Sequence, residues 1–350
     1  MPISGTMNTD PSLAFVGCEI SAGDSAGLGG GGSSHAHTQG RREVVVSGKR
    51  VKTIDVHAHC IVPDAAKLIH HSLEAPGLLW ANIGDRLAQM DQTGVDVEAL
   101  SINPYWYRAE RDAVAELIRV QNEALVEFCA SQPDRFVAFA TAALQYPDLA
   151  AEQVEHAVKT LGFRGIGVAG SVAGEDLANP KFHPFWAKCE ELDVLVFMHP
   201  LGTRELEPSG RLAGNGLLTN TIGNPLETTI ALSHLIFEGT LDRFPGLKIC
   251  AAHAGGYLPS YAGRFDRGCA VRPDLCPGGA HGGIERSPSD YMRQLYYDTM
   301  VFRPEGVRHL VAEVGAGQLM VGTDYPYPWT ERAIELILET PELSEEDRIA

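Results

Sequence analysis

The sequence lacks the features that mark a membrane, secreted or nucleic-acid-binding protein. Its 350 residues contain no apolar run of transmembrane length, and the N-terminus has no basic segment followed by an apolar one. Lys and Arg number 28 against 45 Asp and Glu, so the formal net charge is −17. This acidic balance argues against nucleic acid and anionic membranes as partners. We therefore expect a cytoplasmic protein.

The sequence also lacks a cysteine motif. Its seven cysteines are scattered and odd in number, and none are spaced as CxxC. This usage indicates reduced thiols and agrees with a cytoplasmic location. Cys60 directly follows His59, but the next residue along an extended strand points to the opposite face. We therefore interpret Cys60 as a bystander and not as a metal ligand.

Residues 1–40 lack the hydrophobic pattern of a packed element. Residues 21–40 are rich in Gly and Ser, and residues 29–34 read GGGGSS, which is the composition of a flexible linker. His35 and His37 lie in this segment, so we interpret this pair as non-functional. We predict a flexible extension over 1–40 and one domain over 41–350.

The remaining chain alternates between strand and helix signals. Eight apolar, strand-like runs lie near 54–59, 95–100, 135–141, 163–168, 194–198, 247–252, 295–298 and 319–322. Most are separated by segments with apolar residues at helical spacing, and such alternation predicts a parallel sheet. Eight repeats over about 300 residues favour a closed α/β fold, the (β/α)8 or TIM barrel, over an open sheet.

Two histidines end the first predicted strand. Residues 54–59 read IDVHAH, so His57 and His59 are two positions apart. Alternate side chains of a strand point the same way, which allows both imidazoles to face one point. Two neutral imidazoles that converge suit a zinc-like divalent ion. On its own, the pair is equally compatible with two ordinary strand-end histidines.

Three more polar residues end other predicted strands: His199, His253 and Asp324 follow the fifth, sixth and eighth. The C-terminal ends of the strands form the active-site rim of such a barrel, whereas core histidines would have no reason to share one rim. His57, His59, His199 and Asp324 are a suitable ligand set for one zinc ion with a bound water. His253 is then available as general acid or base, with a fifth ligand or a structural histidine as alternatives. Asp324 could also carry a proton.

The segments that carry these residues resemble the amidohydrolase superfamily. Residues 54–59 (IDVHAH), 197–200 (FMHP), 252–256 (AHAGG) and 322–326 (GTDYP) match its motifs in order. Residues 224–229 (NPLETT) and 244–248 (FPGLK) are similar to the amidohydrolase 2 branch, which aminocarboxymuconate semialdehyde decarboxylase typifies. The similarity begins at about residue 51 and runs to residue 350.

The resemblance implies His253 as catalytic base and one divalent metal ion, most often zinc, with manganese as the other possibility. The implied ligands are His57, His59, His199 and Asp324. One ion is implied and not two, because binuclear relatives carry a carboxylated lysine on the fourth strand and residues 164–169 (RGIGVA) contain none.

The same branch implies a metal-dependent, non-oxidative decarboxylase of a small unsaturated or aromatic carboxylic acid. In it, a metal-bound water and the histidine prepare protonation of the carbon that loses CO2. The alternative is a hydrolase or hydratase on the same scaffold, acting on an amide, a lactone or a dienoic acid, because the fold does not decide the reaction. A catalytically silent barrel is the rival outside the enzymes, and the complete set of expected ligands argues against it.

Three residues are expected to contact the substrate. Arg86 and Arg264 lie where the substrate-binding arginines of that decarboxylase fall, and the guanidinium fork suits a carboxylate. In the family, the equivalent of Arg264 reaches the site of the neighbouring subunit, which implies a homodimer. Trp106 could stack on a planar substrate. The alternatives are surface arginines and ordinary packing of Trp106 at the barrel rim.

Overall fold

The computed structural model describes residues 13–16, 19–22, 40–72, 78, 83–276 and 284–350. All eight predicted strands are present within these ranges. They are β5 (Ile54–His59), β6 (Val97–Ser101), β7 (Phe136–Ala138), β8 (Gly165–Val168), β11 (Leu195–Met198), β12 (Lys248–Ala251), β13 (Tyr296–Asp298) and β14 (Leu319–Met320).

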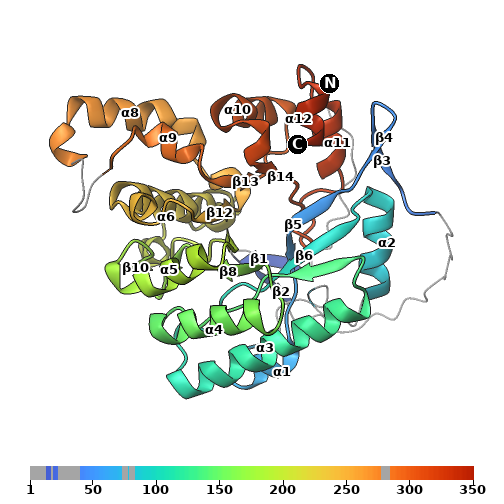
Figure 1. Ribbon diagram of the computed structural model, residues 1–350, viewed down its shortest axis with the longest axis horizontal. Helices are drawn as coiled ribbons and strands as arrows, with labels where there is room; N and C mark the ends of the chain where they lie inside the picture. Colours follow the sequence, from blue (N-terminus) through green and yellow to red (C-terminus); the bar gives the residue numbers. More distant parts are fainter. Residues whose placement is uncertain (1–12, 17–18, 23–39, 73–77, 79–82, 277–283) are drawn as a thin grey trace.

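The eight strands are parallel and close into a barrel (Figure 1). Three of them pair in the order β5-β6-β7, and five pair in the order β14-β13-β12-β11-β8. Parallel bridges join the two sheets at both edges: Asp55 pairs with Val321 between β5 and the end of β14, and Ala140 pairs with Ile166 between β7 and β8. The prediction of a (β/α)8 barrel is therefore confirmed.

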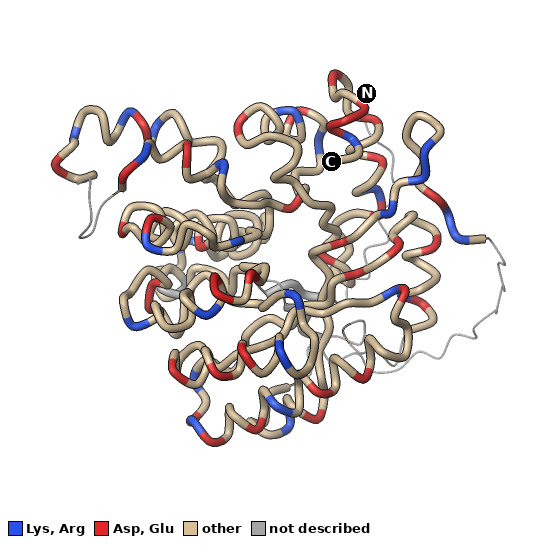
Figure 2. Tube along the Cα trace, in the orientation of Figure 1, with Lys and Arg blue, Asp and Glu red and all other residues tan. Residues whose placement is uncertain are grey.

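Helices surround the barrel, and Lys, Arg, Asp and Glu residues are spread along them and the loops between them (Figures 1 and 2). The longer helices that follow barrel strands are α2 (Ile83–Thr93), α3 (Arg111–Ser131), α4 (Pro147–Lys159), α5 (His183–Glu191), α6 (Asn224–Phe237), α8 (Ala262–Val271), α10 (Pro304–Val314) and α11 (Ala333–Glu339). Shorter ones are α1 (Pro63–Lys67), α7 (Thr240–Arg243), α9 (Pro288–Met292) and α12 (Glu345–Ile349). None of the described helices has both the length and the apolar character that a bilayer span requires.

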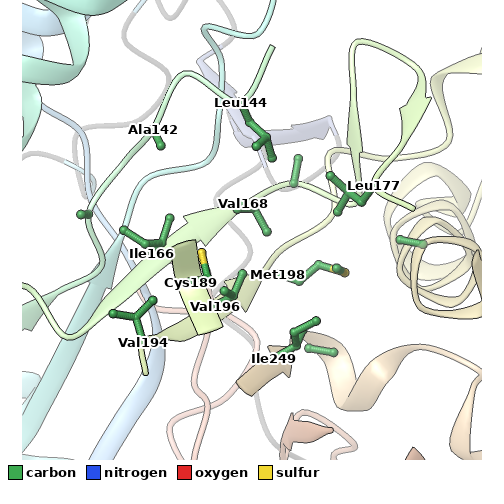
Figure 3. Close-up of a cluster of buried hydrophobic side chains, with 14 of the residues drawn as sticks. Ala142, Leu144, Ile166, Val168, Leu177, Cys189, Val194, Val196, Met198 and Ile249 are labelled. Carbon is green, nitrogen blue, oxygen red and sulfur yellow. The ribbon is translucent and has the colours of Figure 1, made fainter. Parts of the chain in front are cut away.

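Alternate residues of the strands face two separate cores. Ile166 and Val168 of β8 and Val196 and Met198 of β11 lie in one buried cluster between the strands and the helices, together with Cys189 of α5 (Figure 3). Since these residues are two apart on each strand, their neighbours point into the barrel. The layer of strand residues that packs against the helices fixes the register of the strands, and with it the position of their C-terminal ends.

Aromatic rings fill the inside of the barrel. Phe139 and Phe197 stack there with ring centroids 5.2 Å apart. Gly165 of β8 makes room for them, because a Cβ at that position would lie 2.6 Å from a ring carbon of Phe139.

A buried carboxylate ties the first strand to the hairpin that precedes it. The hairpin consists of β3 (Val44–Val46) and β4 (Lys49–Val51), paired antiparallel. Asp96 receives hydrogen bonds from Arg41 and Arg50 at 2.6 Å each and from the backbone N–H of Thr53 at 2.9 Å. Burial raises the pKa of Asp96, but Arg50, the Thr53 N–H and Arg41 outweigh it and lower this pKa to about 2.

The substitution Asp96→Asn is expected to make the fold less sensitive to acid. A pKa of about 2 in the folded chain against about 3.9 in the unfolded chain contributes about 2 kcal/mol of stability above pH 4, which is lost as pH falls through 2. The free energy of unfolding in urea, measured at about pH 5 and about pH 2.5, should therefore fall further in the native protein than in Asp96→Asn. Equal losses would show that this carboxylate is not linked to acid stability.

The N-terminal segment contains one hairpin that the sequence analysis did not predict. Strands β1 (Leu13–Val16) and β2 (Glu19–Ala22) pair antiparallel, although we expected 1–40 to lack packed elements. Leu13, Phe15 and Ile20 are residues that favour strands, and the bias of the surrounding segment toward Gly and Ser concealed them. His35 and His37 lie outside the described residues.

The prediction of reduced thiols is wrong for one pair of cysteines. Cys269, in the last turn of α8, forms a disulfide with Cys276, and their Cα atoms are 5.4 Å apart. The end of the helix and the 3-10 turn Pro273–Leu275 reverse the chain and bring the two residues together, which a spacing of seven does not reveal. Cys60, Cys129, Cys189 and Cys250 are free thiols. The cytoplasmic location stays a prediction.

Candidate metal centre

Four buried side chains converge at the C-terminal end of the barrel. His57 and His59 belong to β5, His199 follows β11, and Asp324 follows β14. One ligand atom from each of these residues can be chosen so that all four atoms lie within 4.8 Å of one another. The structure thus brings together the four predicted metal ligands, and Cys60 is not among them.

Backbone hydrogen bonds between neighbouring strands set these positions. The N–H of Asp324 donates to the carbonyl of His57 at 2.7 Å, and the N–H of His59 donates to the carbonyl of Tyr325 at 2.6 Å. Asp55 adds a side-chain tie, because its carboxylate accepts the N–H groups of His57 at 2.9 Å and Thr323 at 3.2 Å. The first and last strands of the barrel therefore hold the histidine pair against Asp324.

The tautomer of His57 is fixed by a carboxylate behind it. Nδ1 of His57 lies 2.6 Å from Oδ2 of Asp298, and both side chains are fully buried. A carboxylate at that distance accepts the Nδ1 proton, which leaves Nε2 with a free lone pair when the ring is neutral. Nε2 is the atom that faces His59 and Asp324.

His59 has the same tautomer as His57, with the proton on Nδ1, but its partner is a hydroxyl and not a carboxylate. The hydroxyl of Ser101 donates to the carbonyl of Ala58 at 3.1 Å, and its oxygen lies 3.2 Å from Nδ1 of His59. Because the hydroxyl has one proton, its oxygen accepts the Nδ1 proton of His59. The lone pair of His59 is therefore also on Nε2.

The resulting geometry fits a cation. The two Nε2 atoms are 3.0 Å apart, and Oδ1 of Asp324 lies 3.1 Å from that of His57 and 2.8 Å from that of His59. Both ring nitrogens of His199 and both oxygens of Asp324 are buried without a hydrogen-bond partner among the described residues. Lone pairs that converge in this way repel one another unless a proton or a metal ion lies between them. Three imidazoles and one carboxylate are suitable ligands for zinc.

The electrostatics show how the protein holds a proton in this place. Burial lowers the pKa of His57, but the charges of Asp324 and Asp298 outweigh it and raise this pKa to about 10. Burial also holds the pKa of His59 low and that of His199 well below its usual range. Burial raises the pKa of Asp324, but His57 and His59 reverse this effect and hold it well below normal. A metal ion that binds must therefore displace a proton from His57.

His253 lies beside the four ligands without belonging to the group. Its ring centroid is 5.2 Å from those of His57 and His199, and its Nδ1 is buried without a hydrogen-bond partner among the described residues. Burial, followed by the charge of His57, lowers the pKa of His253 to about 4. The ring is thus neutral near pH 7 and able to accept a proton.

A small pocket opens next to His59. It has a volume of about 30 Å³, and Asn103, Tyr105, Leu201 and Tyr327 contribute to its wall. The buried Oδ1 atom of Asn103 has no hydrogen-bond partner among the described residues. None of the described residues that line the pocket is Lys or Arg. A carboxylate bound here must therefore find its positive charge at the metal or on a residue from outside the lining.

Arg86, expected at the substrate, makes its contacts with the protein itself. Its guanidinium is buried, donates to the carbonyl of His59, lies 3.2 Å from Glu98 and stacks 4.6 Å from the ring centre of Tyr325. These contacts support the backbone of β5 from behind. A contact of Arg86 with substrate stays a prediction that this geometry does not support.

Trp106 and Arg264 lie in opposite environments. Trp106 is completely buried and donates its indole N–H to the carbonyl of Ala142 at 2.9 Å, while its neighbour Tyr105 lines the pocket. Arg264 is exposed on α8, which lies at the outer edge of the molecule (Figure 1). Contact with a substrate stays a prediction for both residues.

The sequence analysis missed the residues that orient the ligands. Asp298 ends β13 and Ser101 ends β6, so both lie on the same rim as the ligands. Their position after apolar strands was the signal that could have identified them. The residues themselves are common at strand ends, and nothing in their spacing relates them to His57 or His59.

Comparison with known proteins identifies relatives of the chain. The family model described as amidohydrolase matches residues 54–350. A 2-amino-3-carboxymuconate-6-semialdehyde decarboxylase from Dictyostelium discoideum is 28% identical over 92% of this chain and 83% of its own length. A gamma-resorcylate decarboxylase from a Rhizobium species is 32% identical over 78% of this chain and 88% of its own length.

A solved structure with similar sequence has the same fold. The dihydroxybenzoic acid decarboxylase from Polaromonas, which contains bound manganese and the inhibitor 2-nitroresorcinol, superposes with a TM-score of 0.67. It is 26% identical, and the match covers 85% of this chain and 93% of that one.

Proposed function

Because this chain belongs to the amidohydrolase family, we propose that it is a metal-dependent, non-oxidative decarboxylase of a small unsaturated or aromatic carboxylic acid. The observation that carries the proposal is the buried group of His57, His59, His199 and Asp324 with the neutral His253 beside it. The similar proteins described above are decarboxylases of this kind of acid.

The metal is zinc in this proposal, and manganese is the alternative. Three imidazole nitrogens favour zinc, whereas manganese prefers oxygen ligands. The related Polaromonas structure nevertheless holds manganese. Elemental analysis of the purified protein decides between the two ions.

The bound ion would supply a positive charge that orients the oxygens of the substrate and stabilises negative charge as the reaction proceeds. The carbon–carboxylate bond breaks, CO2 leaves, and the electron pair that stays on the carbon takes up a proton. No electrons are exchanged with a redox partner. The protein must therefore hold the substrate, exclude water and deliver one proton.

His253 is the group that moves this proton. Its pKa of about 4 keeps the ring neutral before the reaction, and Nδ1 carries no hydrogen bond among the described residues. In the proposed reaction the ring takes one proton from solvent water at this nitrogen and gives it to the substrate carbon, so one proton is consumed for each CO2 released. Asp324, with two oxygens at the same centre, is the second group able to assist.

Recognition of the substrate carboxylate is assigned to a second copy of this chain. The described pocket lining contains no Lys or Arg, whereas Arg264 is exposed on the outlying helix α8. Tyr261 and Leu275, next to this helix, expose 50% and 63% of their surface, as residues of an interface do in a single chain. We place Arg264 of the partner subunit at the site of a cytoplasmic homodimer.

The variant Arg264→Ala is expected to lower kcat/KM by about 10- to 100-fold, mainly through KM, because a charged hydrogen-bond pair is lost. Arg267→Ala is the matched control, because Arg267 is also exposed and lies three residues after Arg264 in the same helix. This variant should retain full activity. Mixed dimers of Arg264→Ala and His199→Ala should regain activity, since one of their two sites is complete. No recovery on mixing would place Arg264 outside the neighbouring site.

A substrate screen tests the proposed reaction. The metal-loaded protein is incubated with phenolic, muconic and lactone acids, and the products are examined by mass spectrometry with His253→Ala as control. A product lighter by CO2 that the control does not form supports the proposal. A product heavier by one water would instead establish the hydrolase or hydratase alternative.

A further inference from the structure

We propose that Asp298 is a positioning residue that sets both the metal ligand His57 and the turn that carries His253. This inference rests on the metal site of the proposed function but not on the reaction that the site catalyses. Asp298 ends β13 and is fully buried, between the end of β5 and the end of β12.

One oxygen of Asp298 joins the two functional histidines. Oδ2 lies 2.6 Å from Nδ1 of His57 and accepts the backbone N–H of His253 at 2.9 Å. The first bond fixes the tautomer and the orientation of the ring. Such support of a metal-bound histidine increases the metal affinity of a site.

The other oxygen holds the turn after β12 in an unusual conformation. Oδ1 accepts the N–H groups of Ala254 at 2.8 Å and Met300 at 3.1 Å. His253 and Ala254 have φ angles of 54° and 56°, in the left-handed region that costs energy for residues with a Cβ. The N–H groups of His253 and Ala254 both donate to the carboxylate of Asp298. These two hydrogen bonds offset the conformational cost and keep the ring of His253 next to the ligands.

Only a carboxylate can satisfy this arrangement. All four groups that face Asp298 are donors when the ring of His57 is bound through Nε2: one ring N–H and three backbone N–H groups. An asparagine has one acceptor oxygen, so its NH2 group must face two donors in either orientation. Where NH2 faces Nδ1 of His57, it favours the tautomer with the proton on Nε2, which blocks the metal.

The test is the metal affinity of Asp298→Asn, measured with zinc in competition with a chromophoric chelator. We expect a 10- to 100-fold weaker affinity than that of the native protein. Asp96→Asn is the control, because Asp96 is also buried and accepts a backbone N–H, that of Thr53, while its other hydrogen-bond donors are Arg41 and Arg50 and not a metal ligand. Both variants should unfold at lower temperature, but Asp96→Asn should change zinc affinity by no more than about threefold.

Two results would overturn the proposal: an unchanged zinc affinity in Asp298→Asn, or an equal loss in both variants. A second measurement does not depend on the variant folding. In the 15N spectrum of zinc-loaded, histidine-labelled protein, His57 must carry its proton on Nδ1, and a proton on Nε2 contradicts the proposal. Neither readout uses a substrate, so a failed decarboxylase assay leaves this test intact, and the reverse also holds.

Discussion

Replacing His199 with alanine is expected to lower the metal content from about one ion per chain to near zero and to reduce turnover at least about 1,000-fold. His199 has two buried ring nitrogens without a partner among the described residues, and burial holds its pKa well below the usual range. Its lone pair is therefore free for a metal at neutral pH. Without His199, the remaining ligands are His57, His59 and Asp324. In the absence of a metal ion, these three groups share the proton that His57 carries.

Elemental analysis and steady-state kinetics measure these two effects on the same sample. His156→Ala is the control, since His156 is exposed on α4 and belongs to no buried group. It should keep both the metal and the activity. A His199→Ala protein that retained one tightly bound ion would show that the metal is held elsewhere.

Replacing His253 with asparagine is expected to lower kcat by about 10²- to 10⁴-fold while the metal content stays at one ion per chain. Asparagine is chosen because it tolerates the left-handed conformation that residue 253 adopts with φ 54°. It removes the group that transfers the proton and retains the turn. The measurement is kcat together with the metal-to-protein ratio.

The two readouts separate the possible roles of His253. A variant that loses its metal would make His253 a fifth ligand, contrary to the grouping seen in the structure. A variant with unchanged kcat would remove it from the reaction altogether. Only the loss of activity with retained metal agrees with a general acid or base.

The alternation of strand and helix signals was sufficient to predict the barrel and the rim on which the ligands lie. His57 and His59 followed from the two-residue period of a strand, and His199 and Asp324 followed because they end other strands of one barrel. These predictions depend on periodicity and on the order of elements. Both are local properties that a single sequence contains.

Contacts between distant residues were not predictable in this way. The Asp298–His57 bond joins residues 241 positions apart, and the Cys269–Cys276 disulfide depends on how a helix and a 3-10 turn reverse the chain. Arg86 is a further example: the sequence suggested a substrate contact, which stays a prediction, but it did not indicate that the guanidinium binds the carbonyl of His59 and faces Glu98. Side-chain partners of this kind are decided by tertiary packing.

The most direct test of a metal-dependent, non-oxidative decarboxylase is the release of 13CO2 from a carboxyl-labelled acid. The acid that reacts in the substrate screen is supplied to metal-loaded protein, to chelator-treated protein and to treated protein reloaded with zinc. The account predicts one 13CO2 per acid consumed, without oxygen uptake, in the loaded and reloaded samples only. Labelled carbon retained in a hydrated product, or CO2 release that chelation does not diminish, would contradict it.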